Sequence, residues 1–309
     1  MIGDDVTTYQ VTHRTSYEYE ADVSTSYGQL HLLPRDAPGQ RCRAAEVTID
    51  PPAEDYRERL DFFGNRVCFM AVHEPHRALT VTASSVVEVD ERDAGISLLG
   101  HTPWEQARDA LRHGHATDPV DAAQFVLDSP LIEVADVYRG YAAPSFAPGR
   151  NLLDAVASLS GRIHADFTYK PGATSVTTPL AEVFAQRLGV CQDFAHVGIA
   201  CLRSVGLAAR YVSGYLETDP PPGSPKLTGV DGSHAWLSVL VPEAGWVDLD
   251  PTNDQFANGR YVVTAYGRDY TDVPPMNGVI YTEGRTRSLK VVVDVVAIDA
   301  PAALRPAAR

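Results

Sequence analysis

The stretch Gly189-Val190-Cys191-Gln192-Asp193-Phe194 decides how this 309-residue chain is interpreted. An apolar run over 195–205 follows it and ends at Gly206, which is the pattern of a helix with a glycine stop. Cys191 is therefore expected in the first helical turn. Unpaired backbone N–H groups and the positive end of the helix dipole favour the reactive thiolate form of a cysteine at that position.

Two short β-runs downstream carry an imidazole and a carboxylate. Residues 234–241 and 246–250 are separated by a four-residue linker, which is short enough for a hairpin. If Val241 lies near Trp246, paired positions sum to about 487. His234 then falls within a few residues of Asp250 across the ladder, and both are even-numbered. Asp248 shares this parity and is the rival carboxylate. Together with Cys191, these residues form a nucleophile, base and orienter set.

These blocks, taken in order, resemble the transglutaminase-like superfamily with its papain-like Cys-His-Asp core. The resemblance rests on G-V-C-Q-D-F (189–194), S-H-A-W (233–236), D-L-D-P-T-N (248–253), R-Y-V-S-G-Y (210–215) and G-R-D-Y (267–270). The N-terminal region resembles the bacterial members that carry an extra β-domain. That resemblance rests on the alternating tyrosines, histidine and threonine over 9–19, L-L-P-R (32–35) and D-x-x-G-N (61–65).

The resemblance implies Cys191 as nucleophile, His234 as general base and Asp250 as the orienting carboxylate. The backbone N–H of Cys191 is the expected oxyanion donor. Gln186 lies upstream at a spacing that suggests the second donor, and a solvated side chain is the alternative. Trp236 and Tyr215 are expected to line the acyl cleft, and the loop over 217–233 to form a specificity flap.

Other titratable residues near the motif have structural interpretations. Asp193 suits the first helical turn as an acid that faces the dipole. His196 lies five residues after Cys191 and is expected to point away from it and to pack. Arg268 and Asp269 are expected to form a buried pair, and exposed turn residues are the alternative.

Hydrophobic patterning predicts an α+β protein with two domains. Period-2 alternation over 7–19 and short β-runs up to 88 predict an antiparallel sandwich or barrel, and we expect an N-terminal antiparallel β-sandwich over 1–90. Residues 91–309 are then the catalytic domain, in which the cysteine helix packs on an antiparallel sheet that bears His234 and Asp250. This domain has a helical lead-in over 91–165 and a β-rich tail over 261–299. Thr102-Pro103-Trp104-Glu105 has the form of a capping box at the start of the first helix.

Composition excludes several classes of protein. The net charge is −14, and residues 1–100 carry 9 basic and 17 acidic side chains, which disfavours nucleic acid and an anionic membrane surface. The first residues lack a basic and apolar leader, so a cytoplasmic location is expected. Cys42, Cys68, Cys191 and Cys201 have neither disulfide nor zinc spacing. No metal and no other cofactor is predicted, and the absence of an EF-hand pattern predicts no calcium requirement. The histidine pairs His73/His76 and His113/His115 each lack a third metal ligand nearby in the sequence, so neither pair predicts a metal site.

Three functions follow from these residues. The first is a cysteine protease or amidase that forms a thioester acyl-enzyme on a peptide or protein substrate. A protein-glutamine acyltransferase, or transglutaminase, would use the same three residues. A non-catalytic interaction protein that binds through its N-terminal β-domain is the alternative of another class. The sequence leaves the natural substrate and the oligomeric state open.

Overall fold

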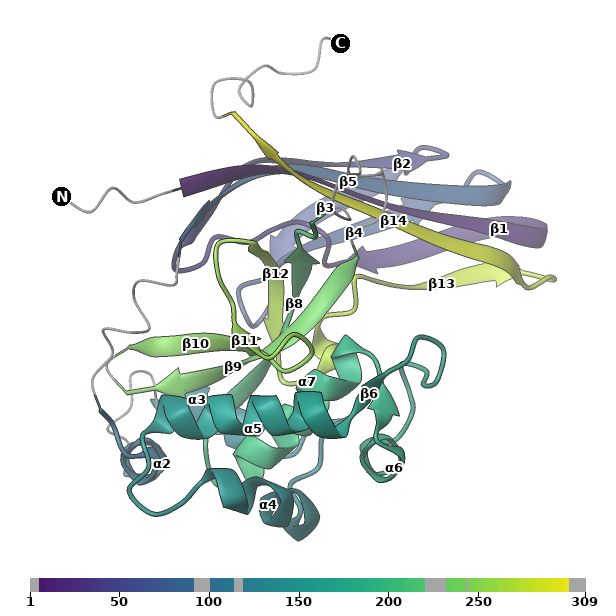
Figure 1. The fold of residues 1–309 in the computed structure, drawn as a ribbon. Helices are drawn as coiled ribbons and strands as arrows, with labels where there is room; N and C mark the ends of the chain where they lie inside the picture. The colour runs from purple at the N-terminus through teal and green to yellow at the C-terminus, as the bar shows by residue number, and fades with distance from the viewer. Residues whose placement is uncertain (1–5, 92–100, 114–118, 220–231, 243, 300–309) are drawn as a thin grey trace.

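The chain folds into two antiparallel sheets and a layer of helices (Figure 1). The computed structural model describes residues 6–91, 101–113, 119–219, 232–242 and 244–299. A seven-stranded sheet lies on one side, a five-stranded sheet lies in the middle, and the helices cover the other side. No helix in these ranges is both long and apolar enough to cross a membrane. The predicted α+β class is confirmed.

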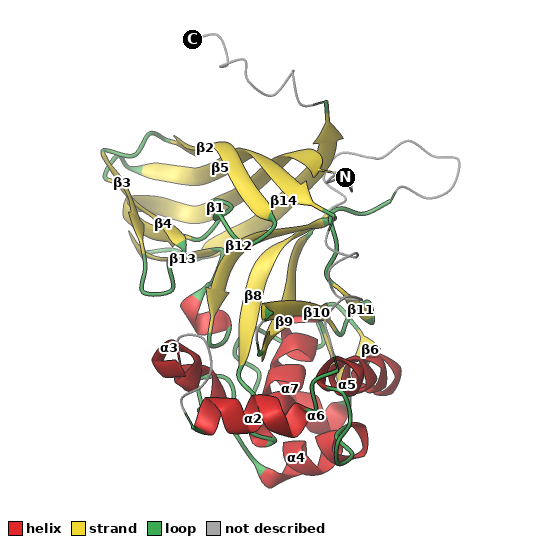
Figure 2. Ribbon diagram, turned by 90° about the vertical axis from the view of Figure 1, so that its left-hand side faces the viewer, coloured by secondary structure: helices red, strands yellow, loops and turns green. Residues whose placement is uncertain are grey.

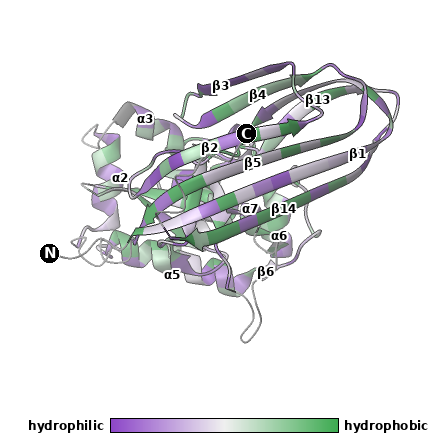
Figure 3. Ribbon diagram, turned by 90° about the horizontal axis from the view of Figure 1, so that it is seen from above, coloured by the Kyte–Doolittle hydropathy of each residue, from purple (hydrophilic) through white to green (hydrophobic). Residues whose placement is uncertain are grey.

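The first sheet is built around the long strand β1 (Val6–Leu30). Its residues Tyr9, Val11, His13 and Thr15 are buried, and the residues between them are more exposed, as the period-2 pattern predicts. The same alternation of hydrophobic and hydrophilic residues is visible along the strands in Figure 3. The other members are β2 (Gln40–Asp50), β3 (Asp55–Leu60), β4 (Arg66–Val72), β5 (His76–Asp90), β13 (Met276–Thr282) and β14 (Thr286–Ile298).

The two halves of β1 pair with different strands. The N-terminal half pairs with β5 and β14, and the C-terminal half pairs with β4 and β13. Leu30, Met70 and Val81 come from three of these strands and share one buried cluster. This confirms an antiparallel N-terminal β-structure. Its seven strands form one sheet, curved as a half-barrel around β1. They do not form the two separate sheets of a sandwich.

The C-terminal tail is divided between the two sheets, which corrects the predicted domain boundary. Residues 261–299 were expected to extend the catalytic domain. Only β12 (Tyr261–Gly267) does so, because β13 and β14 return to pair with β1. Val293 and Val295 of β14 are buried beside Tyr9 and Val11. Burial of this apolar strand face on β1 explains why the tail returns to the first sheet.

The second sheet and one helix carry the predicted site. The strands run in the order β11 (Gln255–Phe256), β10 (Gly245–Asp250), β9 (Ser233–Val241), β8 (Ala209–Leu216) and β12. Helix α7 (Cys191–Ser204) packs on β8 and β9. Gly198 permits this close approach, since a Cβ there would lie 2.4 Å from Leu237 Cδ2. The result is the predicted helix-on-sheet core.

The remaining helices lie around this core (Figure 2). They are α2 (Trp104–Arg112), α3 (Pro119–Ala123), α4 (Asp136–Ala142), α5 (Leu152–Asp166) and α6 (Leu180–Gln186). Of these, α4, α5 and α6 pack against α7. 3₁₀ turns cover Gln124–Val126, Ala143–Ser145 and Tyr270–Asp272, and β6 (Thr168–Tyr169) pairs in parallel with β7 (Leu188–Gly189). The capping box predicted at the start of α2 is wrong. Pro103 occupies the N-cap position, and Glu105 accepts from the Gly149 N–H.

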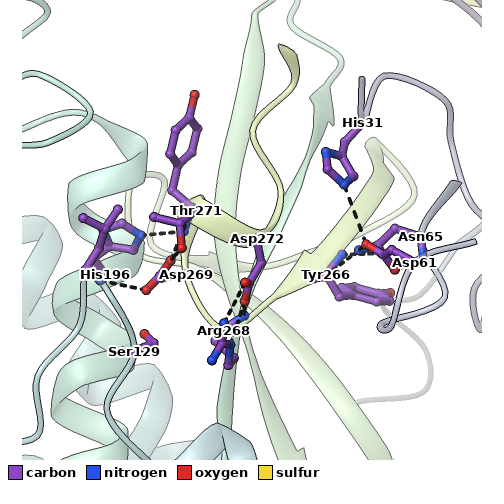
Figure 4. A network of polar contacts seen from close by, with 12 residues as sticks. His31, Asp61, Asn65, Ser129, His196, Tyr266, Arg268, Asp269, Thr271 and Asp272 are labelled. Atoms are coloured by element: carbon purple, nitrogen blue, oxygen red, sulfur yellow. Dashed lines mark hydrogen bonds and ion pairs between the residues drawn. The ribbon is translucent and has the colours of Figure 1, made fainter. Parts of the chain in front are cut away.

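Two side-chain amides join the sheets. Asn65 donates to the carbonyl of Tyr266 at 2.7 Å and accepts from its N–H at 2.8 Å (Figure 4). Gln40 forms the same two-point contact with Val263, at 2.8 and 2.7 Å. Because β12 is an edge strand, these amides satisfy backbone groups that a neighbouring strand would otherwise pair. The N-terminal sheet is thus hydrogen-bonded directly to the sheet that carries His234.

Candidate active site

Cys191 is the first residue of α7, and its thiol is partly exposed. The buried Asp193 carboxylate accepts from the Val190 N–H at 2.8 Å and from Thr174 Oγ1 at 2.7 Å. Asp193 is therefore occupied in fixing the start of the helix, as predicted. A Cβ at Gly189 would lie 2.6 Å from Asp193, which explains the glycine two residues before Cys191. The entry into α7 is fixed around the thiol.

The β9–β10 hairpin brings His234 and Asp250 together. Val241 pairs with Gly245 and Leu237 with Leu249, close to the register predicted from the linker length. The distance from His234 Nε2 to Asp250 Oδ2 is 2.6 Å. Gly245 has a φ of +81°, which suits a tight turn. The predicted proximity of the imidazole and the carboxylate is confirmed, and their catalytic roles stay a prediction.

Asp250 is fully buried and accepts several further hydrogen bonds. Its Oδ1 accepts from the Thr252 N–H at 2.8 Å, and its Oδ2 accepts from Asn253 Nδ2 at 2.6 Å and from the Tyr261 hydroxyl at 2.8 Å. Burial alone would raise the pKa of Asp250. Hydrogen bonding and charge from His234, with the hydrogen bonds from Asn253 and Tyr261, hold that pKa below its usual range. The carboxylate is thereby kept ionised and fixed in position.

Cys191 and His234 contact each other through their side chains. The thiol lies beside the ring, close enough for its charge to act on the imidazole. Because Nε2 faces Asp250, Nδ1 is the nitrogen available to sulfur. Burial lowers the pKa of His234, but the hydrogen bonds to Asp250 and Cys191 and their charges outweigh it and raise the pKa to about 10. An imidazolium beside a cysteine at a helix start is the arrangement that supports a thiolate nucleophile.

Three residues predicted around the cleft have other roles. Gln186 is exposed, and its amide donates to Glu182 in the same helix at 2.9 Å, which favours the alternative of a solvated side chain. Tyr215 lies buried between the two sheets, where its hydroxyl contacts His13 Nδ1 and Leu32 O, both at 3.1 Å. Tyr215 therefore does not line the acyl cleft.

Trp236 is fully buried, so it does not line the acyl cleft either. Its ring lies 5.1 Å from that of Tyr261 and 6.0 Å from that of His234. Its indole N–H donates to Asp248 at 3.2 Å, which gives the rival carboxylate a different partner. Trp236 thus packs behind the His234–Asp250 pair.

A polar network links His196 of α7 to the segment 268–272 that follows β12 (Figure 4). His196 is buried, as expected, and its Nε2 accepts from the Tyr270 N–H at 3.2 Å, while burial lowers its pKa to about 4. The expected Arg268–Asp269 pair is wrong. Arg268 pairs with Asp272 at 2.9 Å, and the buried Asp269 accepts from the Leu131 and Thr271 N–H groups, both at 2.8 Å. Asp269 thus joins two loops through backbone N–H groups.

Two predictions fall partly on residues that the structure does not describe. Residues 220–231 of the expected flap and His115 lie outside the described ranges. Within those ranges, no three histidine, cysteine or acidic side chains are grouped to hold a metal ion.

Asn253 and Tyr261 are the site residues that sequence reasoning missed. Asn253 was noted only as context for Asp250, and Tyr261 lies on a strand with no motif of its own.

Comparison with known proteins matches both regions of the chain. Residues 9–88 match the bacterial transglutaminase-like N-terminal region, and residues 139–251 match the transglutaminase-like superfamily. An uncharacterized protein of Mycobacterium tuberculosis is 47% identical over 300 residues, which cover 95% of this chain and 94% of that protein. A protein-glutamine gamma-glutamyltransferase of Pseudomonas aeruginosa is 37% identical over 101 residues, which cover 31% of this chain and 15% of that protein.

The fold is also found in a solved structure. The crystal structure of a proposed cysteine protease from Cytophaga hutchinsonii covers 96% of this chain and 92% of its own, with a TM-score of 0.71 at 19% sequence identity. It therefore shares the arrangement of both sheets and the helices. The two matched regions show that the chain belongs to the transglutaminase-like superfamily, and the shared fold agrees with this.

Proposed function

We propose that the protein is a cysteine enzyme that acts on amide bonds through a thioester. The single observation that carries this proposal is the chain of contacts from Asp250 through His234 to Cys191. Carboxylate, imidazole and thiol are linked in the order that nucleophilic catalysis requires, with the thiol at a helix start. Burial of a carboxylate is costly, and the donors around Asp250 offset that cost and fix its position beside His234.

The proposed mechanism assigns one task to each group. The Cys191 thiolate attacks the amide carbonyl carbon, and the carbonyl oxygen becomes an oxyanion near the unpaired N–H groups at the start of α7. The C–N bond then breaks as His234 gives its Nδ1 proton to the leaving nitrogen, which leaves a thioester on Cys191. His234, now neutral, removes a proton from water, whose oxygen attacks the thioester. The carboxylic acid departs, and the protonated imidazole and the thiolate are restored.

Hydrolysis and acyl transfer differ only in the second nucleophile. We favour hydrolysis of a peptide or protein, because no feature of the described residues marks a dedicated amine site. The similarity to the Pseudomonas glutamyltransferase supports acyl transfer as the second candidate, over about a third of this chain. A non-catalytic interaction protein would not require the contacts among Cys191, His234 and Asp250, so that alternative is disfavoured.

The test is turnover of a protein substrate with three simultaneous readouts. The protein is incubated with casein, and new α-amino groups, ammonia and incorporation of a fluorescent primary amine are followed. Hydrolysis of peptide bonds yields amino groups, deamidation yields ammonia, and acyl transfer yields labelled casein. Cys191→Ala should abolish whichever signal is found, whereas Cys42→Ala, which alters a distant partly exposed thiol, should leave it unchanged. Activity that survives Cys191→Ala would exclude the proposed nucleophile.

A further inference from the structure

A cavity lies at the junction of the two sheets. It has a volume of about 620 Å³, and its walls come from residues 35–39, the end of β5, strands β8 and β10, and Tyr266 of β12. Cys191, His234 and Asp250 do not line it. The cavity therefore requires an explanation separate from the proposed chemistry.

Arg210 lies in the wall of this cavity between two aromatic rings. Its guanidinium carbon is 4.3 Å from the ring centre of Trp246 and 3.5 Å from that of Tyr266. The guanidinium carbon of Arg35 lies 4.5 Å from the centre of the same Tyr266 ring. Cation–π stacking holds the plane of a guanidinium but leaves its N–H groups directed outward from the edge. The stack therefore fixes Arg210 without using its donors.

The donors of Arg210 are unmatched within the described part of the chain. Its Nε is buried and has no hydrogen-bond acceptor there. The Ser238 hydroxyl, on the residue that pairs with Arg210 in the sheet, is buried and also has no partner among the described residues. Arg203 shows the contrast, because its guanidinium donates to Ala209 O, Leu127 O, Ser129 Oγ and Arg268 O. Arg203 is thus held by hydrogen bonds, whereas Arg210 is held by ring stacking and keeps a buried donor without an acceptor among the described residues.

We propose that this cavity binds an organic carboxylate through Arg210. The planar fork of a guanidinium matches a carboxylate in a two-point hydrogen bond. The same wall carries the carboxylates of Asp36, Asp90, Glu91 and Asp248 beside Arg35 and Arg210, and this excess of negative charge repels a doubly charged phosphate more than a singly charged carboxylate. Trp246, Tyr266 and Pro38 supply apolar surface for the body of the ligand. A free amino acid and the C-terminus of a peptide both have this chemistry.

Calorimetric titration of the full chain tests the proposal. Cys191→Ala protein is used so that no probe is turned over. The probes are L-leucine, the peptide Ala-Ala-Leu, its C-terminal amide and inorganic phosphate. Saturable binding of Ala-Ala-Leu with no binding of its amide is expected. Binding of L-leucine as well would show that a free amino acid suffices, and binding of the peptide alone would identify a peptide end.

Variants separate the site from non-specific binding. Arg210→Lys, made in the same background, keeps the charge but removes the planar fork, and is expected to weaken binding at least tenfold. Arg57→Lys changes an exposed arginine outside the cavity and should leave binding unchanged. If Arg210→Lys does not fold, Ala244→Trp at the exposed rim should instead block entry. Equal binding of acid and amide, preference for phosphate, absence of binding, or affinity unaffected by these cavity variants would overturn the proposal.

Discussion

Replacing Asp250 by asparagine removes one charge and leaves the shape of the side chain nearly unchanged. In the native protein the carboxylate faces His234 Nε2 at 2.6 Å, Asn253 Nδ2 at 2.6 Å and the Tyr261 hydroxyl at 2.8 Å. All three can donate to a carboxylate. If the asparagine nitrogen took the place of Asp250 Oδ2, it would face three other hydrogen-bond donors. If the asparagine oxygen took that place, it would lack the negative charge that stabilises the imidazolium.

The structure sets the size of the expected effect. A hydrogen bond to a charged group contributes about 1.5–3 kcal/mol. At about 1.36 kcal/mol per factor of ten, its loss lowers a rate that depends on the imidazolium roughly 10- to 150-fold. The pKa of His234 should also fall from about 10, because burial then acts with less opposition. The protonated ring is present below its pKa and is lost as pH rises through that value, so the variant should lose it at lower pH.

Nuclear magnetic resonance of ¹⁵N-labelled histidine measures this change directly. The His234 signal, assigned by its absence in His234→Gln, should remain that of imidazolium at pH 8 in the native protein and titrate at lower pH in Asp250→Asn. An Asp248→Asn variant is the matched control, because Asp248 contacts Trp236 and not His234. If Asp250→Asn titrates like the native protein, the assigned role of this carboxylate is refuted.

Three further changes test other parts of the structure. Tyr261→Phe removes one donor to Asp250, and we expect casein turnover to fall about fivefold for a loss of about 1 kcal/mol. Gly198→Ala would place a methyl group 2.4 Å from Leu237, and overpacking of about 1–3 kcal/mol should exceed the gain in helix propensity and lower the urea midpoint. Gln186→Ala should leave turnover unchanged, because this exposed amide contacts Glu182; a large loss would restore it as an oxyanion donor.

Local pattern predicted much of the site. The helix after Gly189, the hairpin and the shared parity of His234 and Asp250 all depend on residues near one another in the chain, where turn length and periodicity determine register. The antiparallel N-terminal strands were predicted for the same reason. Tyr215 was misplaced, because a strand pattern gives alternation but not which face meets the other sheet.

Long-range pairing could not be read in this way. The return of β14 to β1 joins residues nearly 300 positions apart, and no local signal specifies that partner. The two-point contacts of Gln40 and Asn65 with β12 likewise depend on tertiary placement. Tyr261 reaches Asp250 only because β12 and the β9–β10 hairpin belong to one sheet. A side chain that contacts the site from a distant strand cannot be recognised from the spacing of residues in the sequence.

The most direct test of the central claim is the rate at which each cysteine reacts with iodoacetamide near neutral pH. Mass spectrometry of peptides from the native protein and from His234→Ala would give separate rates for Cys191 and Cys42, both of which are partly exposed. Burial raises the pKa of Cys42, so it serves as an unactivated reference. We predict that Cys191 reacts much faster than Cys42 and a free model thiol, and that His234→Ala removes the difference. Equal rates for Cys191 and the model thiol, or a rate unchanged by His234→Ala, would contradict an activated nucleophile.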